Sequence, residues 1–277
     1  MQAERPIGIF DSGIGGLTVA NAVLNALPNE SLIYFGDTAH LPYGDKSPET
    51  IRRYSYTITD FLLDQGAKLI IIACNSASSV AFDSVQEQAA EKEVRVVNVI
   101  DPVAAFVSVS NYKKVGVIGT RATIGSQIFP QKISEMNPEI EVASLATPLL
   151  APMIESGFVK GDISRVIIEN YMEDEALKDI DALVLACTHY PLIKKEISNY
   201  LAENGRKVEI LATNEIVARY VRTLLEETHL ISQQPGVSHQ FFVSDYTESF
   251  AETTRLFYKK EVSLQHSPIF SNDNLNV

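Results

Sequence analysis

The chain has 277 residues, is 45% hydrophobic and carries a formal net charge of −12, and these values limit its class. The length predicts two domains or one large α/β unit, and the acidic balance argues against nucleic acid as the main partner because no basic face is left for phosphates. No apolar run reaches the roughly 20 residues of a membrane helix, and the N-terminus enters a strand too soon for a signal peptide. Two cysteines make no disulfide framework, so we expect a cytoplasmic protein with reduced thiols.

Short apolar runs recur along the chain, and each is followed by a longer segment with helical spacing. The expected strands span residues 6–10, 32–36, 68–74, 94–100, 114–119, 140–146, 181–187, 207–212 and 239–245. A helix is expected at 48–66, with Pro and Glu in its first turn and Gly66 at its end. Strands rich in β-branched residues that alternate with helices indicate an α/β protein with parallel sheets. The tail from about Gln265 has the composition of a disordered segment.

A weak internal repeat relates the two parts of the chain. The run that starts at Ile7 matches the run that starts at Val115, an offset of 108. Cys74 matches Cys187 at an offset of 113, and the run from residue 96 matches the run from residue 208 at an offset of 112. These nearly constant offsets predict two similar parallel-sheet α/β domains that face each other across a cleft.

Ligands of open parallel sheets bind beyond the carboxyl ends of the strands, so the residues that follow each strand are candidate site residues. The first strand is followed by Asp11, Ser12 and a glycine-rich turn, which can bring backbone N–H groups close to a carboxylate or phosphate. The turn is not a dinucleotide fingerprint, because Thr18 stands where the last glycine is needed, and it lacks the lysine of a P-loop. The second strand is followed by Pro42-Tyr43-Gly44, where turn chemistry alone is a sufficient explanation.

The two cysteines occupy similar positions, each directly after an apolar run. Cys74 precedes Asn75-Ser76, and Cys187 precedes Thr188-His189. One buried cysteine is usually a small apolar residue, but a strand-to-helix junction favours a thiolate, and here there are two such junctions. The spacing fits neither a zinc site nor a C-x-x-C dithiol, and a Cys-His nucleophile would leave one cysteine without a role. Two equivalent thiols suit proton transfer at opposite faces of one carbon, which is the geometry of a two-base racemase.

Six segments of the chain resemble the cofactor-independent aspartate/glutamate racemase family: FDSGIGGLTV, YFGDTAHLPYG, ACNSAS, VIDPV, GVIGTRATI and ACTHYPL. They run in order from about Ile7 to Leu192, and residues 241–258 resemble the C-terminal strand and helix of the family more weakly. The resemblance implies an isomerase that interconverts L- and D-glutamate with no cofactor and no metal, and that supplies D-glutamate for peptidoglycan synthesis. It further implies a homodimer, with no nucleic acid and no membrane as partner, and two α/β domains, one of residues 1–98 plus 210–277 and the other of residues 99–209.

Carried over position by position, the resemblance makes Cys74 and Cys187 the two acid/base thiols, assisted by Asp11 and His189. The substrate-binding positions that it implies are Asp11, Ser12, Pro42, Tyr43, Gly44, Asn75, Ser76, Thr188, His189 and Glu155. The chain departs from the family at Ser76, where Thr is common, and at Ala186, where Gly is common. It departs again at residues 212–214, which read Ala-Thr-Asn where the family usually has Asp-Ser-Gly.

Three other interpretations stay open at this point. An aspartate racemase would use the same pair of cysteines and differ in the depth of its pocket. A non-catalytic binder of small anions could be built on the same two-lobed scaffold, although it would leave the paired thiols without a purpose. A regulatory partner of another protein could coexist with catalysis.

Overall fold

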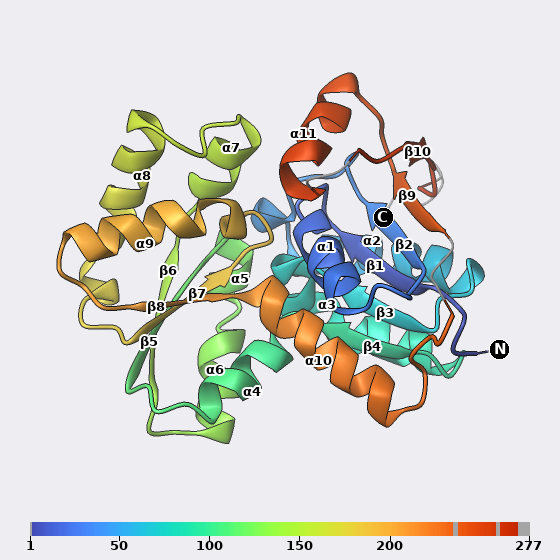
Figure 1. Cartoon of the computed structure of the whole chain (residues 1–277), viewed down its shortest axis with the longest axis horizontal. Helices are drawn as coiled ribbons and strands as arrows, with labels where there is room; N and C mark the ends of the chain where they lie inside the picture. Colours follow the sequence, from blue (N-terminus) through green and yellow to red (C-terminus); the bar gives the residue numbers. More distant parts are fainter. Residues whose placement is uncertain (1, 235–237, 259–260, 271–277) are drawn as a thin grey trace.

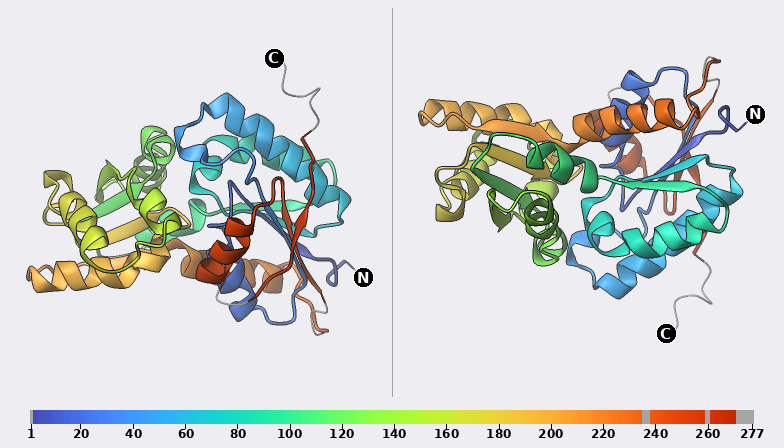
Figure 2. Two further views of the ribbon diagram at one scale, coloured as in Figure 1. Left: turned by 90° about the horizontal axis from the view of Figure 1, so that it is seen from above. Right: turned by 90° about the horizontal axis from the view of Figure 1, so that it is seen from below.

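The computed structural model describes residues 2–234, 238–258 and 261–270, which form two α/β halves lying side by side (Figure 1). Each half is built on its own parallel β-sheet, with helices on both faces of that sheet (Figures 1 and 2). Within these ranges no helix has both the length and the apolar character needed to cross a membrane.

The first half contains a six-stranded sheet in the order β10-β9-β2-β1-β3-β4, in which every neighbouring pair is parallel. The chain enters it through β1 (Ile7–Asp11), α1 (Leu17–Ala26), β2 (Leu32–Gly36), α2 (Pro48–Asp64), β3 (Leu69–Ile72), α3 (Asn75–Ala90) and β4 (Arg95–Asn98). It returns at its C-terminal end through α10 (Thr213–Glu227), β9 (His239–Val243), α11 (Glu248–Tyr258) and β10 (Leu264–His266).

The second half contains a four-stranded parallel sheet in the order β6-β5-β7-β8. Its elements are α4 (Asp101–Ser108), β5 (Lys114–Gly119), α5 (Arg121–Gly125), α6 (Ile128–Met136), β6 (Glu141–Ala146), α7 (Leu150–Glu155), α8 (Asp162–Met172), β7 (Ala182–Ala186), α9 (Lys194–Glu203) and β8 (Glu209–Ala212). The four strands β2-β1-β3-β4 of the first sheet have the same order as β6-β5-β7-β8. The predicted α/β class with two similar parallel sheets is therefore confirmed.

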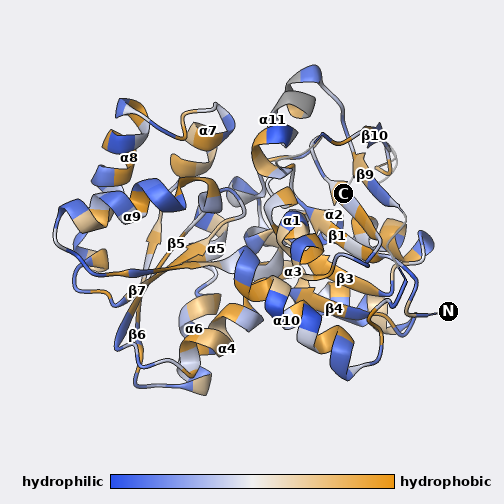
Figure 3. Ribbon diagram, in the orientation of Figure 1, coloured by the Kyte–Doolittle hydropathy of each residue, from blue (hydrophilic) through white to orange (hydrophobic). Residues whose placement is uncertain are grey.

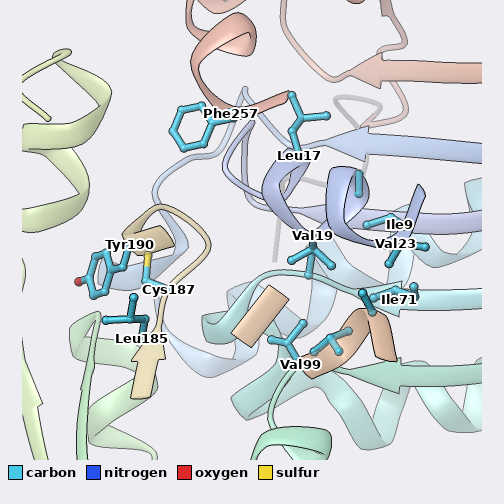
Figure 4. Packing of buried hydrophobic residues seen from close by; sticks show 14 of the residues in the cluster. Ile9, Leu17, Val19, Val23, Ile71, Val99, Leu185, Cys187, Tyr190 and Phe257 are labelled. Carbon is cyan, nitrogen blue, oxygen red and sulfur yellow. The ribbon is translucent and has the colours of Figure 1, made fainter. Parts of the chain in front are cut away.

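Alternation along the strands divides the core into layers. On one face of the first sheet, side chains of β1 to β3 pack against α2 and α3. Side chains on its other face join α1, α10 and α11 in an apolar cluster that continues into the second half, where it includes Leu185 and Cys187 (Figure 4). The far face of the second sheet packs against α4 and α6. Apolar residues concentrate on the strands and on the inner sides of these helices (Figure 3), as expected for parallel sheets that are covered on both faces.

The ends of α2 follow from local chemistry. The side chain of Ser47 caps the helix by accepting a hydrogen bond from the backbone N–H of Thr50 at 3.3 Å, and Pro48 occupies the first turn. The helix ends at Asp64 because Gly66 has a φ of +80°, a left-handed conformation that glycine adopts readily. The prediction of a helix at 48–66 is thus correct to within two residues.

The prediction of a disordered tail from about Gln265 is wrong for residues 265 and 266. Residues Leu264–His266 form β10, which pairs in parallel with β9 at the edge of the first sheet. The rest of that prediction, at residues 271–277, lies outside the described residues. The strand has only three residues, two of them polar, so its formation depends on the neighbouring strand more than on its own composition.

The chain passes between the two halves twice, once from β4 into α4 and once from β8 into α10. The predicted division into residues 1–98 plus 210–277 and residues 99–209 stays a prediction. Its second boundary falls within β8, which pairs with β7 in the second sheet as far as Ala212.

A buried ion pair in the first half connects two segments that lie far apart in the chain. The Nζ atom of Lys68 lies 2.6 Å from Oε2 of Glu30, and both side chains are almost completely buried. Lys68 also donates to the backbone carbonyls of Ala3 and Leu230, and Glu30 accepts a hydrogen bond from the backbone N–H of Ser232 at 2.8 Å. The network therefore joins the N-terminal segment to the segment between α10 and β9.

We expect Lys68→Met to lower the free energy of unfolding by about 3–5 kcal/mol, because it leaves the Glu30 carboxylate buried without its counterion. Urea denaturation measures the change through the midpoint of the transition. The control is the double variant Lys68→Met/Glu30→Gln, which removes both charges and should lose less stability than Lys68→Met alone. Equal losses in the two variants would show that the unpaired charge is not the cause.

Candidate active site

A cavity of about 70 Å³ lies between the two halves, at the carboxyl ends of their strands. It contains eleven of the twelve residues that the sequence predicts for the site: Ser12, Pro42, Tyr43, Gly44, Cys74, Asn75, Ser76, Glu155, Cys187, Thr188 and His189. Both thiols therefore face one space, with one thiol contributed by each half. The cavity is small compared with the several hundred Å³ of most ligand pockets, so the described structure has a tightly closed site.

Cys74 stands at the N-terminus of α3, directly after β3. Its Sγ atom accepts a hydrogen bond from the backbone N–H of Ala77 at 3.5 Å, and its thiol donates to Oγ of Ser12 at 3.6 Å. Burial raises the pKa of the Cys74 thiol to about 12, and the nearby charge of Asp11 acts in the same direction. The lowered thiol pKa expected from the helix N-terminus is not found at Cys74, because desolvation outweighs the helix dipole there.

Cys187 begins a relay of three side chains. Its Sγ atom lies 3.7 Å from Nδ1 of His189, and Nε2 of His189 lies 2.8 Å from Oε1 of Glu155 at the end of α7. Burial alone would lower the pKa of His189, but its hydrogen bonds to Cys187 and Glu155 and the charges of both partners raise that pKa to about 10. A protonated imidazole beside Cys187 can pair with a thiolate at that position. Cys187 precedes a short 3-10 turn at Tyr190–Ile193 and not the start of an α-helix. The positive charge near its sulfur therefore comes from His189 and not from a helix N-terminus.

Asp11 is the one predicted residue that does not line the cavity. It is completely buried at the end of β1, where Oδ2 accepts a hydrogen bond from the backbone N–H of Gly13 at 3.2 Å. Burial raises the pKa of its carboxyl group, whereas the charge of His189 lowers it. Asp11 therefore interacts electrostatically with both Cys74 and His189 from behind the cavity wall.

The turn at residues 42–44 forms one wall of the cavity, but the Tyr43 hydroxyl is already used. It donates to Oδ2 of Asp37 at 2.6 Å, while Oδ1 of Asp37 accepts from Oγ of Ser244 at 2.7 Å and lies 2.8 Å from Nδ1 of His40. This buried network holds the turn against the end of β9. A contact between Tyr43 and a ligand is thus left to its ring and backbone.

The polar side chains around the cavity suit a small organic anion. The amide Nδ2 and Oδ1 atoms of Asn75 are buried and have no hydrogen-bond partner within the described ranges, so they are available to a ligand. The hydroxyls of Ser12, Ser76 and Thr188 stand around the same space. No cluster of three or more His, Cys, Asp or Glu side chains that could hold a metal ion occurs among the residues described.

Six further residues line the cavity without having been predicted: Gly13, Leu41, Thr120, Ala151, Pro152 and Ala186. Thr120 is the most informative of them, because its Oγ1 atom lies 2.8 Å from Oγ of Ser76 across the boundary between the halves. The internal repeat contained the signal, since an offset of 108 places Thr120 in the position of Ser12.

The fold and this site define a racemase class. Residues 15–258 match the Asp/Glu/Hydantoin racemase family, and the chain belongs to that family. Within the family it groups with the glutamate racemases. It is 40% identical over 256 residues to the glutamate racemase of Geobacter metallireducens, which covers 91% of this chain and 92% of the relative. It is 42% identical over 259 residues to that of Chlorobaculum parvum, with 93% of each chain covered.

A solved structure supports the same grouping. Glutamate racemase from Francisella tularensis, crystallised in complex with D-glutamate, superposes with a TM-score of 0.88 at 39% identity. The match covers 96% of this chain and 98% of that one. The resemblance inferred from the six sequence segments is thus confirmed.

Proposed function

We propose that Cys74 and Cys187 carry out the glutamate racemase activity of this chain by proton transfer at opposite faces of the substrate Cα. The observation that supports this most directly is the position of both thiols in one cavity, each contributed by a different half. One thiolate removes the α-proton, and the opposite thiol delivers a proton to the other face of the same carbon. The reverse reaction uses the same pair with the protonation states exchanged.

The two thiols have different surroundings and take different starting roles. Burial raises the pKa of the Cys74 thiol to about 12, so this thiol starts as the acid. Cys187 starts as the base, with Nδ1 of His189 3.7 Å from its sulfur and Nε2 of His189 held in turn by Glu155. Asp11 and His189 assist by adjusting the charge near the thiols.

The remaining cavity residues bind the substrate. The hydroxyls and the Asn75 amide donate hydrogen bonds to the two carboxylates, while Pro42, Tyr43 and Gly44 line the same cavity. The α-proton of an amino acid is far less acidic than a thiol, so these preorganised donors must stabilise the carbanion-like transition state. The reaction in this proposal needs no cofactor and no metal.

The test is incubation of the purified, reduced protein with L-glutamate in D2O without added cofactor. The α-proton signal should disappear in NMR spectra while optical rotation falls to zero. A parallel incubation with aspartate examines the alternative substrate. No change in the α-proton signal or in optical rotation with either substrate would contradict the proposal and favour a small-anion binder.

The family implies a role in supplying D-glutamate for peptidoglycan synthesis, and we place that role in the cytoplasm. We also propose that the chain forms a homodimer. Sedimentation velocity at micromolar concentration should then give a single species of twice the chain mass of 30.6 kDa, and a species of one chain mass would contradict the dimer.

A further inference from the structure

The segment from Cys187 to His189, here the Cys187 loop, belongs to the second half but is held by the first. It follows β7 of the second sheet and carries a thiol and the imidazole beside it. Two side chains from elements of the first half contact it, namely Thr18 of α1 and Phe257 of α11. Neither residue lines the cavity, so neither is placed to touch the substrate.

Thr18 fixes the backbone of the Cys187 loop. Its hydroxyl donates to the carbonyl oxygen of Thr188 at 2.8 Å and lies 3.0 Å from the carbonyl oxygen of Gly15. The side chain is buried, and it joins residues that are 170 positions apart in the chain. A buried hydrogen bond of this kind restrains the carbonyl between the thiol and the imidazole, because breaking it leaves an unpaired polar group.

Phe257 fixes the ring of His189. The two rings meet edge to face, with centroids 5.0 Å apart and an interplanar angle of 79°. Phe257 is 1% exposed, and it extends from α11 toward the half that carries Cys187 (Figure 4). An apolar ring at this point keeps water away and leaves the imidazole nitrogens facing Cys187 and Glu155.

We propose that Thr18 and Phe257 are positioning residues that hold the Cys187 loop in its catalytic geometry. The inference rests on the proposed roles of Cys187 and His189. His189 lies 2.8 Å from Glu155 and 3.7 Å from the Cys187 sulfur, and we expect loss of either positioning residue to release the distance to the sulfur. Cys187 and His189 are therefore held in the geometry for proton transfer by the contacts of α1 and α11 with the Cys187 loop.

The experiment compares Thr18→Val and Phe257→Leu with matched controls. Thr59→Val removes another buried hydroxyl that donates to a backbone carbonyl at 2.8 Å, within α2 and away from the site. Tyr258→Leu removes the next aromatic ring of α11, which packs on Phe241 instead of His189. Each control therefore loses a similar buried group without touching the Cys187 loop.

We expect kcat to fall about tenfold to a hundredfold in Thr18→Val and Phe257→Leu, with KM almost unchanged, because positioning is lost while the substrate contacts remain. The two controls should keep the kcat of the natural chain. Melting curves recorded on all four variants show whether each is folded. Valine has nearly the same shape as threonine, so we expect Thr18→Val to fold. This variant tests the proposal by itself if Phe257→Leu does not fold.

A second measurement separates positioning from a general loss of structure. Iodoacetamide labels both cysteines in the same molecules, and peptide mass spectrometry gives the rate at Cys187 relative to the rate at Cys74. We expect this ratio to fall in Thr18→Val and Phe257→Leu, because the imidazole that lies 3.7 Å from the Cys187 sulfur is no longer held in place. The ratio should not change in Thr59→Val and Tyr258→Leu.

The outcomes distinguish this inference from the proposed function on which it rests. Full racemisation by Cys187→Ala would remove the proposed role of that thiol, and the positioning proposal with it. An inactive Cys187→Ala, together with Thr18→Val and Phe257→Leu variants that match their controls in kcat and labelling ratio, would overturn the positioning proposal alone.

Discussion

Replacing either Cys74 or Cys187 by alanine is expected to abolish racemisation while leaving α-proton exchange with one enantiomer. Each variant loses the acid or the base at one face of the substrate, and general acid–base groups contribute about a hundredfold to ten-thousandfold to rate. We therefore expect kcat/KM for racemisation to fall by about a thousandfold or more in each variant. Optical rotation measures this loss directly.

The exchange pattern is the sharper part of the prediction. A single remaining thiolate can remove the proton of the enantiomer whose Cα–H bond faces it and return deuterium to the same face. In D2O, Cys74→Ala should exchange one enantiomer of glutamate and Cys187→Ala the other, both without inversion. The two variants act as controls for each other, since the two thiols lie in one cavity and both side chains are buried. Exchange of both enantiomers by either variant would contradict the two-base mechanism.

Gly15→Ala is expected to lower kcat by about a hundredfold, because the backbone at Gly15 lies directly against the Cys187 loop. A Cβ atom at this position would stand 2.4 Å from Cε1 and 2.5 Å from Nδ1 of His189, and 2.5 Å from Oγ1 of Thr188. Real Cβ atoms essentially never come that close to another atom, so the Cys187 loop or the backbone at position 15 would have to shift. The glycine-rich turn was expected to let the backbone approach a ligand, and at Gly15 the group in close approach is the imidazole of His189 instead.

Gly125→Ala is the matched control for this prediction. Gly125 is the last residue of α5, and a Cβ atom there would have no heavy atom of another residue within 4 Å. Steady-state kinetics on both variants, with melting temperatures recorded in parallel, measure the difference. A Gly15→Ala variant as active as Gly125→Ala would show that the loop tolerates displacement of His189.

The sequence predicts the strands well because they are buried runs of β-branched residues. Nine of the ten strands found in the described ranges match expected runs to within a few residues, whereas β10 was missed because its three residues carry no apolar pattern. The site could also be predicted, since parallel strands direct their carboxyl ends to one edge and the residues after β1, β2, β3 and β7 meet there.

The features that escaped prediction depend on tertiary packing. The raised pKa of Cys74 arises from burial of the thiol and from the charge of Asp11, and no local signal in the residues around position 74 shows it. The contact of Phe257 with His189 depends on how α11 packs, although the two residues lie far apart in the chain. The contact of Thr120 with Ser76 could have been inferred only by applying the repeat to each position of the first loop.

The two chain passages between the halves have a mechanical consequence. A single connection would act as a flexible tether and allow rotation in every direction, but two connections, at residues 98–101 and 212–213, define an axis. The first is stiffened by Asn98, whose Oδ1 accepts from the backbone N–H groups of Ile100 and Asp101 at 2.8 and 2.7 Å. A rotation of one half against the other would therefore turn about this axis, and we expect it to bring both thiols back to the same relative position.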